Sequence, residues 1–171
     1  MDIKSKILVI LTKFFSKEIT TIAVAALPIF ELRLSIPLAI LKFHLSPLAA
    51  FLLSILGNIL PIIPFLLFLR WALTRLEHMK GIGKLLVWWF NRAEKKSQVV
   101  QTYGFWGLVI FVAIPLPGTG AWTGCVVATL FKFKLPKAFL AVSLGVLGAA
   151  IIVQSIVVLG SAGLAKLFSL F

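Results

Sequence analysis

The feature that most constrains this chain is a series of apolar stretches, separated by short basic segments. Each stretch is about 20 residues long, the length that a helix needs to cross a bilayer core of about 30 Å. Hydrophobic residues make up 61% of the 171 positions and charged residues only 13%, whereas soluble domains carry about 25% charged residues. The sequence therefore predicts an all-α integral membrane protein, and a prokaryotic cell membrane is its expected location.

The net charge of +12 comes from Lys and Arg residues that flank the apolar stretches. This placement suits anionic lipid headgroups better than a groove for nucleic acid. We therefore expect anionic membrane lipids as partners, and no nucleic acid. The single Cys125 and the two histidines, His44 and His78, are too few for a metal cluster. Cys125 also has no histidine partner in the apolar regions, so we expect no metal, no cofactor and no enzymatic activity.

Two of the apolar stretches read as clean membrane spans, at 47–69 and 138–159. Ser46 and Pro47 suit the first turn of the first span, and Pro61 and Pro64 predict kinks within it. The second span carries small residues at four-residue steps, a spacing that permits close contact between helices: Ala141, Gly145 and Ala149.

Three flanking segments are too polar or too short to span. Residues 1–18 place apolar side chains at helical spacing between lysines, which predicts an amphipathic helix at the membrane interface. Residues 70–104 hold many charges around "LLVWWF", which predicts a second interfacial helix, and residues 160–171 read as an interfacial tail. The triplet at 23–25 resembles a signal-peptidase site, but charges interrupt the apolar region before it, so we expect no cleavage.

The other two apolar segments, 19–41 and 105–131, contain helix breakers. The first holds Pro28 and Pro37 around Glu31 and Arg33, and a charge at bilayer depth costs about 2.5–3.5 kcal/mol. The second concentrates its breakers within ten positions: Pro115, Pro117, Gly118, Gly120 and Gly124. Because broken backbone cannot face lipid, we expect two re-entrant hairpins with tips near "FELRLS" and "PGTGAW". Kinked full-length spans are the alternative.

An internal repeat links these segments. "KFHLSPLAAFLLSILGN" at 42–58 parallels "KFKLPKAFLAVSLGVLG" at 132–148, and each follows a broken apolar segment. One membrane domain, 1–171, would then contain repeat one at 1–73 and repeat two at 74–171. Each repeat orders its elements as interfacial helix, re-entrant hairpin and span. Counting crossings makes the two copies inverted, the layout in which paired broken segments meet at a midplane site.

Glu31 is the only one of the five acids that lies inside an apolar segment. Burial raises the pKa of a carboxyl group and a neighbouring arginine lowers it, so we expect Glu31 to titrate near neutrality, as proton coupling requires. Arg33 offers a planar fork suited to phosphate or carboxylate. The alternative is a mutual ion pair that only pins the hairpin.

The second tip, "PGTGAWTG", resembles an anion cradle, because its glycines expose backbone N–H groups and Thr119 and Thr123 add hydroxyls. It is not a P-loop, since the lysine is missing. Trp122 either stacks on a ligand or packs, while Asn58 and Gln154 either face the hairpins or bond a neighbouring helix. The candidate site comprises Glu31, Arg33, Asn58, Pro115, Pro117, Gly118, Thr119, Gly120, Trp122, Thr123 and Gly124.

"PIFELRLSIPLAI" and "FVAIPLPGTGAWTG" together resemble the paired motifs of the small multidrug export proteins, a family distantly similar to the DedA/VTT membrane proteins. The resemblance implies re-entrant hairpins and, as in some DedA/VTT members, translocation of phosphorylated lipids. It matches Glu31 with the acidic residue of the first hairpin and the Pro-Gly tip with the second. DedA proteins carry arginines around their second motif, whereas residues 111–124 contain none, so Arg33 would have to supply the positive charge.

These observations predict a small transporter or lipid translocase, proton-coupled through Glu31. The alternative is a protein that organises or scrambles lipids without transport. Two spans and two hairpins enclose little volume, so we also expect a homodimer.

Overall fold

The computed structural model describes residues 14–75, 98–116 and 118–168, and every element in these ranges is a helix. Two helical stretches in them are long and apolar enough to cross a membrane, Pro47–Leu73 and Leu135–Gly160. They coincide with the spans expected at 47–69 and 138–159. The all-α fold with two candidate spans is therefore confirmed.

Contacts divide the chain into two compact units. The first comprises Met1–Asn58 and Ala150–Phe171, and the second comprises Ile59–Ala149. The long helix α9, Leu135–Phe168, contributes residues to both units. Helix α9 continues through residues 160–168 without a break, beyond the candidate span that ends at Gly160, and the interfacial location expected for 160–171 stays a prediction. No proline interrupts that stretch, and alanine and leucine favour helix there.

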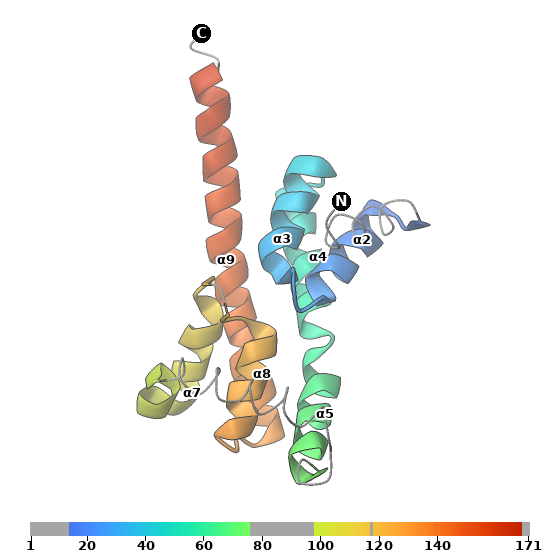
Figure 1. Cartoon of the computed structure of the whole chain (residues 1–171). Helices are drawn as coiled ribbons and strands as arrows, with labels where there is room; N and C mark the ends of the chain where they lie inside the picture. Colours follow the sequence, from blue (N-terminus) through green and yellow to red (C-terminus); the bar gives the residue numbers. More distant parts are fainter. Residues whose placement is uncertain (1–13, 76–97, 117, 169–171) are drawn as a thin grey trace. The chain divides into compact units, whose positions relative to one another are not determined.

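The first unit contains a helical hairpin followed by a longer helix. Helix α2, Lys17–Ala26, ends before a turn at 27–30, and α3, Glu31–Pro37, continues into the π-helical turn η1, Leu38–Lys42. After 43–46 the chain reverses into α4, Pro47–Ile59, so that α3 and α4 run in opposite directions (Figure 1). The proline-bearing segment 19–41 is thus broken, as its sequence predicts.

Close packing fixes α2 and α3 against α4 within this unit. A Cβ at Gly57 would lie 2.3 Å from the carbonyl oxygen of Ile22, so α2 and α4 approach to a distance that only glycine allows. The hydroxyl of Ser35 on α3 donates to that of Ser54 on α4 over 2.7 Å, and both serines are completely buried.

Helix α4 ends where the prolines of the first span begin. Pro61 has no N–H to donate to the carbonyl of Gly57, so the regular bonding pattern fails there. The helix resumes as α5, Ile62–Arg75. The span is thus interrupted at Pro61, as its sequence predicts, whereas Pro64 lies in the first turn of α5.

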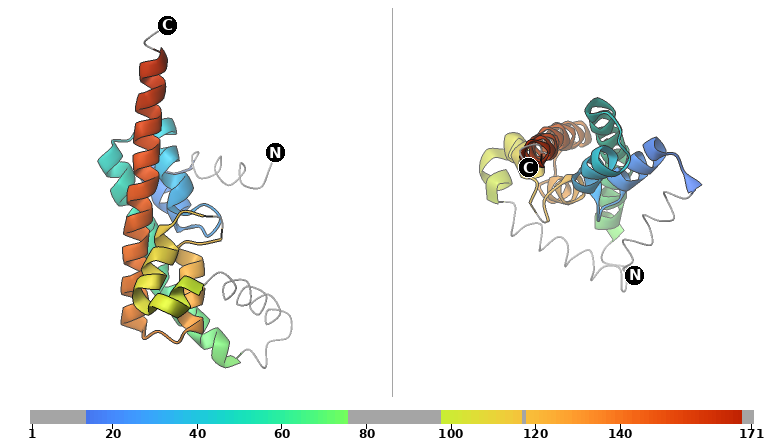
Figure 2. Two further views of the ribbon diagram at one scale, coloured as in Figure 1. Left: turned by 90° about the vertical axis from the view of Figure 1, so that its left-hand side faces the viewer. Right: turned by 90° about the horizontal axis from the view of Figure 1, so that it is seen from above.

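The second unit holds α5, a second helical hairpin and the first part of α9. Helix α7, Gln98–Ala113, bends at Gly104, whose φ of 54° a residue with a side chain rarely adopts, and α8 spans Ala121–Leu130. These helices lie against the first part of α9 (Figure 2). A Cβ at Gly145 would lie 2.5 Å from Cβ of Val112, which confirms the close contact expected from the small residues of this span.

The two hairpins end in the same way. The N–H of Phe43 donates to the carbonyl of Leu38 over 3.0 Å, and the N–H of Phe133 donates to that of Ala128 over 3.0 Å. Each phenylalanine carbonyl then accepts a hydrogen bond from a cationic side chain, Lys17 at 3.2 Å and Arg70 at 2.5 Å respectively. A cation at a helix C-terminus donates to a carbonyl that lacks a partner in the helix, and it is attracted to the negative end of the helix dipole.

The expected interfacial helices fall mostly outside the described residues. Of the segment 1–18, residues 17–18 already belong to α2. Of the segment 70–104, residues 70–75 belong to α5 and residues 98–104 to α7. The expectation for "LLVWWF" concerns residues that the structure does not describe, so it stays a prediction.

Candidate functional site

Glu31 stands at the point where the turn of the first hairpin becomes α3. Its N–H donates to the carbonyl of Leu27 over 3.0 Å, and its φ is 51°, a left-handed conformation. That conformation costs a residue with a Cβ roughly 1–2 kcal/mol. Only 7% of Glu31 is exposed. A strained backbone thus holds a carboxyl group away from solvent, a combination that is costly unless the charge is compensated.

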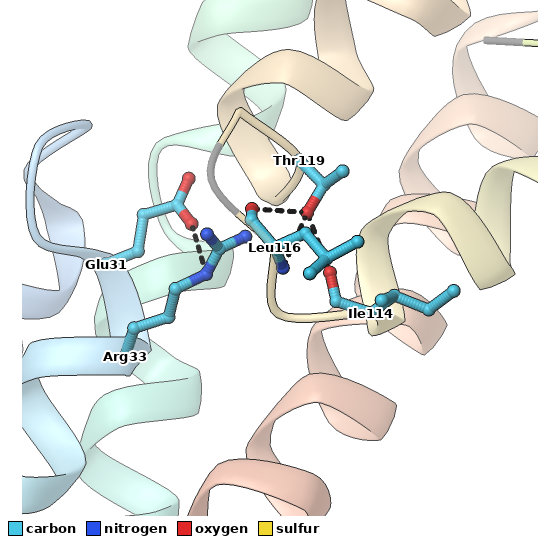
Figure 3. Close-up of polar contacts among 5 residues, drawn as sticks. All are labelled: Glu31, Arg33, Ile114, Leu116 and Thr119. Carbon is cyan, nitrogen blue, oxygen red and sulfur yellow. Dashed lines mark hydrogen bonds and ion pairs between the residues drawn. The ribbon is translucent and has the colours of Figure 1, made fainter. Parts of the chain in front are cut away.

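Arg33 supplies compensating charge two residues later. Its Nε lies 3.9 Å from Oε2 of Glu31 (Figure 3). This distance is longer than the 2.7–3.2 Å of an N–H···O hydrogen bond, so the contact is an electrostatic attraction rather than a tight fork. Arg33 is more exposed than Glu31, with 26% of its side chain accessible against 9%. The two residues expected to form the first half of the site therefore lie together.

Three further polar side chains are buried on α3 and α4 of the same unit. Ser35 and Ser54 bond each other, and Asn58 lies one turn beyond Ser54 with 1% of its surface exposed. The buried Oδ1 of Asn58 has no hydrogen-bond partner. Asn58 was expected at the site from the sequence, whereas the two serines were not. Their signal was four-residue spacing, Glu31 to Ser35 and Ser54 to Asn58, within otherwise apolar helices.

At the second predicted tip, residues 114–116 and 118–120 form a turn that is closed by its own threonine. The Thr119 hydroxyl lies 2.7 Å from the carbonyl oxygen of Ile114 and 2.8 Å from that of Leu116, and it accepts the N–H of Leu116 over 3.2 Å (Figure 3). Gly118 and Gly120 have φ values of 84° and 118°, which favour glycine. The hydroxyl expected to bind an anion thus bonds the turn itself. Pro115 lies in this turn, and Pro117 is outside the described residues.

The remaining candidates lie on the first turn of α8. Trp122 packs on Phe65 of α5, with ring centroids 4.4 Å apart, while its buried Nε1 has no partner. A Cβ at Gly124 would lie 2.4 Å from Cγ2 of Val112, so this glycine lets α8 approach α7. Thr123, which lies between Trp122 and Gly124 in the sequence, is half-buried. Packing is therefore the observed role of Trp122 and Gly124.

The candidates form two groups, one in each compact unit. Glu31, Arg33 and Asn58 belong to the first unit, and residues 115–124 belong to the second. Within the described residues, no group of three His, Cys, Asp or Glu side chains lies close enough to hold a metal ion. The chemistry that the first group offers is the gain and loss of a proton at Glu31 next to a fixed positive charge.

Comparison with known proteins places the chain in a family. No curated protein and no solved structure matches it significantly. A family model with the description "Putative small multi-drug export protein" matches residues 31–152. That match begins at Glu31, covers the first motif from that residue on and the whole of the second, and accounts for well over half of the chain, which therefore belongs to the small multidrug export protein family.

Proposed function

We propose that this protein is a proton-coupled membrane transporter in which Glu31 carries the proton. The observation that carries the proposal is a nearly buried carboxyl group, strained into place in the broken segment of an apolar chain and paired loosely with Arg33. An ionisable group within a membrane segment is a site hypothesis by default. The family description, which names export, supports the same class of function.

The charges of the pair suggest how a proton and a substrate would be linked. Ionised Glu31 attracts Arg33, whereas protonated Glu31 does not, so protonation releases the guanidinium for another anion. Arginine suits phosphate and carboxylate because its planar fork matches their geometry. We therefore propose an amphipathic substrate with an anionic group, a lipid phosphate included.

The inverted-repeat architecture belongs to this proposal as well. The matched bonds at Phe43 and Phe133 support it, because these residues occupy equivalent positions in the 42–58 and 132–148 copies. Each copy also follows a helical hairpin. Re-entrant insertion of both hairpins and a shared midplane site remain predictions of the repeat.

Proteoliposomes with a fluorescent phosphatidic acid provide the test. Its movement between leaflets is followed with and without an imposed pH gradient, in the wild type and in Glu31→Gln. We expect the gradient to change the wild-type rate and to leave Glu31→Gln unaffected. Glu18→Gln is the matched control, because Glu18 is an exposed acid at the start of α2. A Glu31→Gln rate that responds to the gradient like the wild type would refute the role of Glu31.

The ion pair itself favours one alternative, a lipid-organising or lipid-scrambling protein in which Glu31 and Arg33 only pin the turn. Lipid movement would then ignore every ion gradient. The double variant Glu31→Gln/Arg33→Gln would also move lipid at the wild-type rate. In the transporter, the double variant loses coupling because both the proton carrier and the anion partner are gone.

A homodimer is the proposed assembly, since two spans and two hairpins enclose little volume. Native mass measurement of the protein in lipid nanodiscs gives a direct answer. A monomer at all concentrations rejects the dimer without affecting the proposal for Glu31.

A further inference from the structure

Two faces of buried polar side chains meet between α3 and α4. Glu31 and Ser35 are four residues apart on α3, and Ser54 and Asn58 are four residues apart on α4, so each pair lies on one helix face. The bond between Ser35 and Ser54 joins the two faces at 2.7 Å. That bond fixes the register of one helix against the other.

The antiparallel direction of the helices sets which residues come next (Figure 1). One turn back along α3 from Ser35 is Glu31, and one turn forward along α4 from Ser54 is Asn58. Both steps lead away from the reversal at 43–46, so Glu31 and Asn58 occupy the same layer. Burial agrees with this placement, since 7% of Glu31 and 1% of Asn58 are exposed.

Asn58 has a buried hydrogen-bond acceptor in that layer that lacks a donor. Its buried Oδ1 accepts no hydrogen bond, and a buried acceptor without a donor destabilises the fold. Ser35 donates its hydroxyl hydrogen to Ser54, and neither serine bonds Oδ1 of Asn58. An ionised carboxylate has no proton to donate, whereas a protonated carboxyl group is a hydrogen-bond donor. Protonated Glu31 would thus supply the donor that Asn58 lacks.

We infer that Asn58 is the positioning residue for the proton on Glu31, with its Oδ1 accepting a hydrogen bond from the protonated carboxyl group. The inference rests on the proposed function and adds a second position for Glu31. Ionised Glu31 faces Arg33, as in the structure. A proton from water then adds to one carboxylate oxygen, the attraction to Arg33 is lost, and the O–H turns to Asn58. No other bond forms or breaks.

The other charged side chains of residues 14–58 lie away from that layer. Lys17 and Glu18 are in the first turn of α2, at the end opposite the turn that leads to Glu31, and Lys42 is at the far end of η1. Helix α4 has no charged residue, and neither do residues 150–160 of α9. Among residues 14–58 and 150–160, Arg33 is therefore the charged group that competes with Asn58 for Glu31.

An infrared titration of the full chain in liposomes tests the inference without knowledge of the substrate. The difference between wild type and Glu31→Gln isolates the carboxyl band of Glu31 and its midpoint. We expect Asn58→Leu to lower the midpoint by about one pH unit, because a buried hydrogen bond is worth about tenfold in an equilibrium. The carboxyl band should also move toward the frequency of a group without a hydrogen bond. Asn58→Ala should act in the same direction if leucine disturbs folding.

Ser143→Ala is the matched control, because it removes a buried hydroxyl without a partner from the other unit. Its midpoint should equal that of the wild type. An unchanged midpoint and band in both Asn58 variants overturns the inference. A higher midpoint also overturns it, because it would mean that the Asn58 amide donates its Nδ2–H to ionised Glu31.

The failures of the inference and of the proposed function are distinguishable. If the titration depends on Asn58 but lipid movement ignores the pH gradient, the proton switch stands and coupled transport fails. If movement depends on Glu31 while the Asn58 variants titrate like the wild type, transport stands and the inference fails.

Discussion

The approach of α2 to α4 in the first unit makes a sharp prediction for Gly57→Ala. The added Cβ would lie 2.3 Å from the carbonyl oxygen of Ile22 and 2.8 Å from Cβ of Ala25, whereas ordinary contact begins at 3.4 Å. The backbone of α2 would have to retreat by roughly 1 Å, since 3.4 − 2.3 = 1.1 Å. Overpacking of this kind costs about 1–3 kcal/mol.

Two terms compete in the free energy of this variant. Alanine in a helix interior is favoured over glycine by about 1 kcal/mol, which offsets part of the clash. The clash involves backbone rather than the end of a flexible side chain, so relaxation is limited. We expect a net destabilisation of about 1–2 kcal/mol, at the upper end of what these two terms leave.

Gly160→Ala separates the clash from the change in helix propensity. Gly160 lies in α9, and a Cβ there would have nothing within 4 Å. Only the propensity term remains, so this control should be neutral or stabilising. Thermal unfolding in one detergent, followed by circular dichroism, measures both variants against the wild type. A melting temperature of Gly57→Ala equal to or above that of Gly160→Ala would refute the close approach of α2 and α4.

Three further predictions concern single hydrogen bonds. Ser54→Ala should destabilise the protein by about 1–3 kcal/mol because it leaves the buried Ser35 hydroxyl unpaired, whereas the Ser35→Ala/Ser54→Ala double variant should be close to neutral; denaturant unfolding measures both. Thr119→Val should loosen the 114–120 turn and speed its hydrogen exchange, with little change in α8. The pKa of Glu18 is lowered by a bond to its own backbone, then by Ser16 and Lys17. Its stabilisation of the α2 start is therefore present above the ordinary carboxyl pKa and lost as pH falls below it, and amide exchange at the α2 start in wild type against Glu18→Gln checks this.

The sequence predicted the features that depend on local chemistry. The two spans follow from length and hydropathy, and the break in the first span follows from Pro61, which lacks the N–H that α4 needs to continue. The turn that precedes Glu31 follows in the same way from Pro28. Glycines predicted the turn at Gly118 and Gly120, where φ is positive.

Features that depend on pairing between distant segments could not be read from the sequence. Nothing local indicates that Ser35 meets Ser54, because the partner is fixed only when α3 and α4 fold together. The role of Thr119 could not be predicted either, because a hydroxyl in a glycine-rich turn can bond either an anion or the backbone of the turn itself.

The two units differ in the polar groups that they bury. Among the described residues, the polar residues that are buried as a whole are Thr20, Thr21, Glu31, Ser35, Ser54 and Asn58 in the first unit and Thr129 in the second. The second unit also buries single polar atoms of Trp122 and Ser143. Thr129 donates to the carbonyl of Cys125 in its own helix over 2.7 Å, so it needs no outside partner. The second unit instead packs through Gly124 and Gly145. In the proposed repeat, the two copies would share their hairpin endings at Phe43 and Phe133 but differ in their buried carboxyl group, which only the first has. We therefore expect proton chemistry to follow Glu31 and its neighbours rather than the symmetry of the repeat.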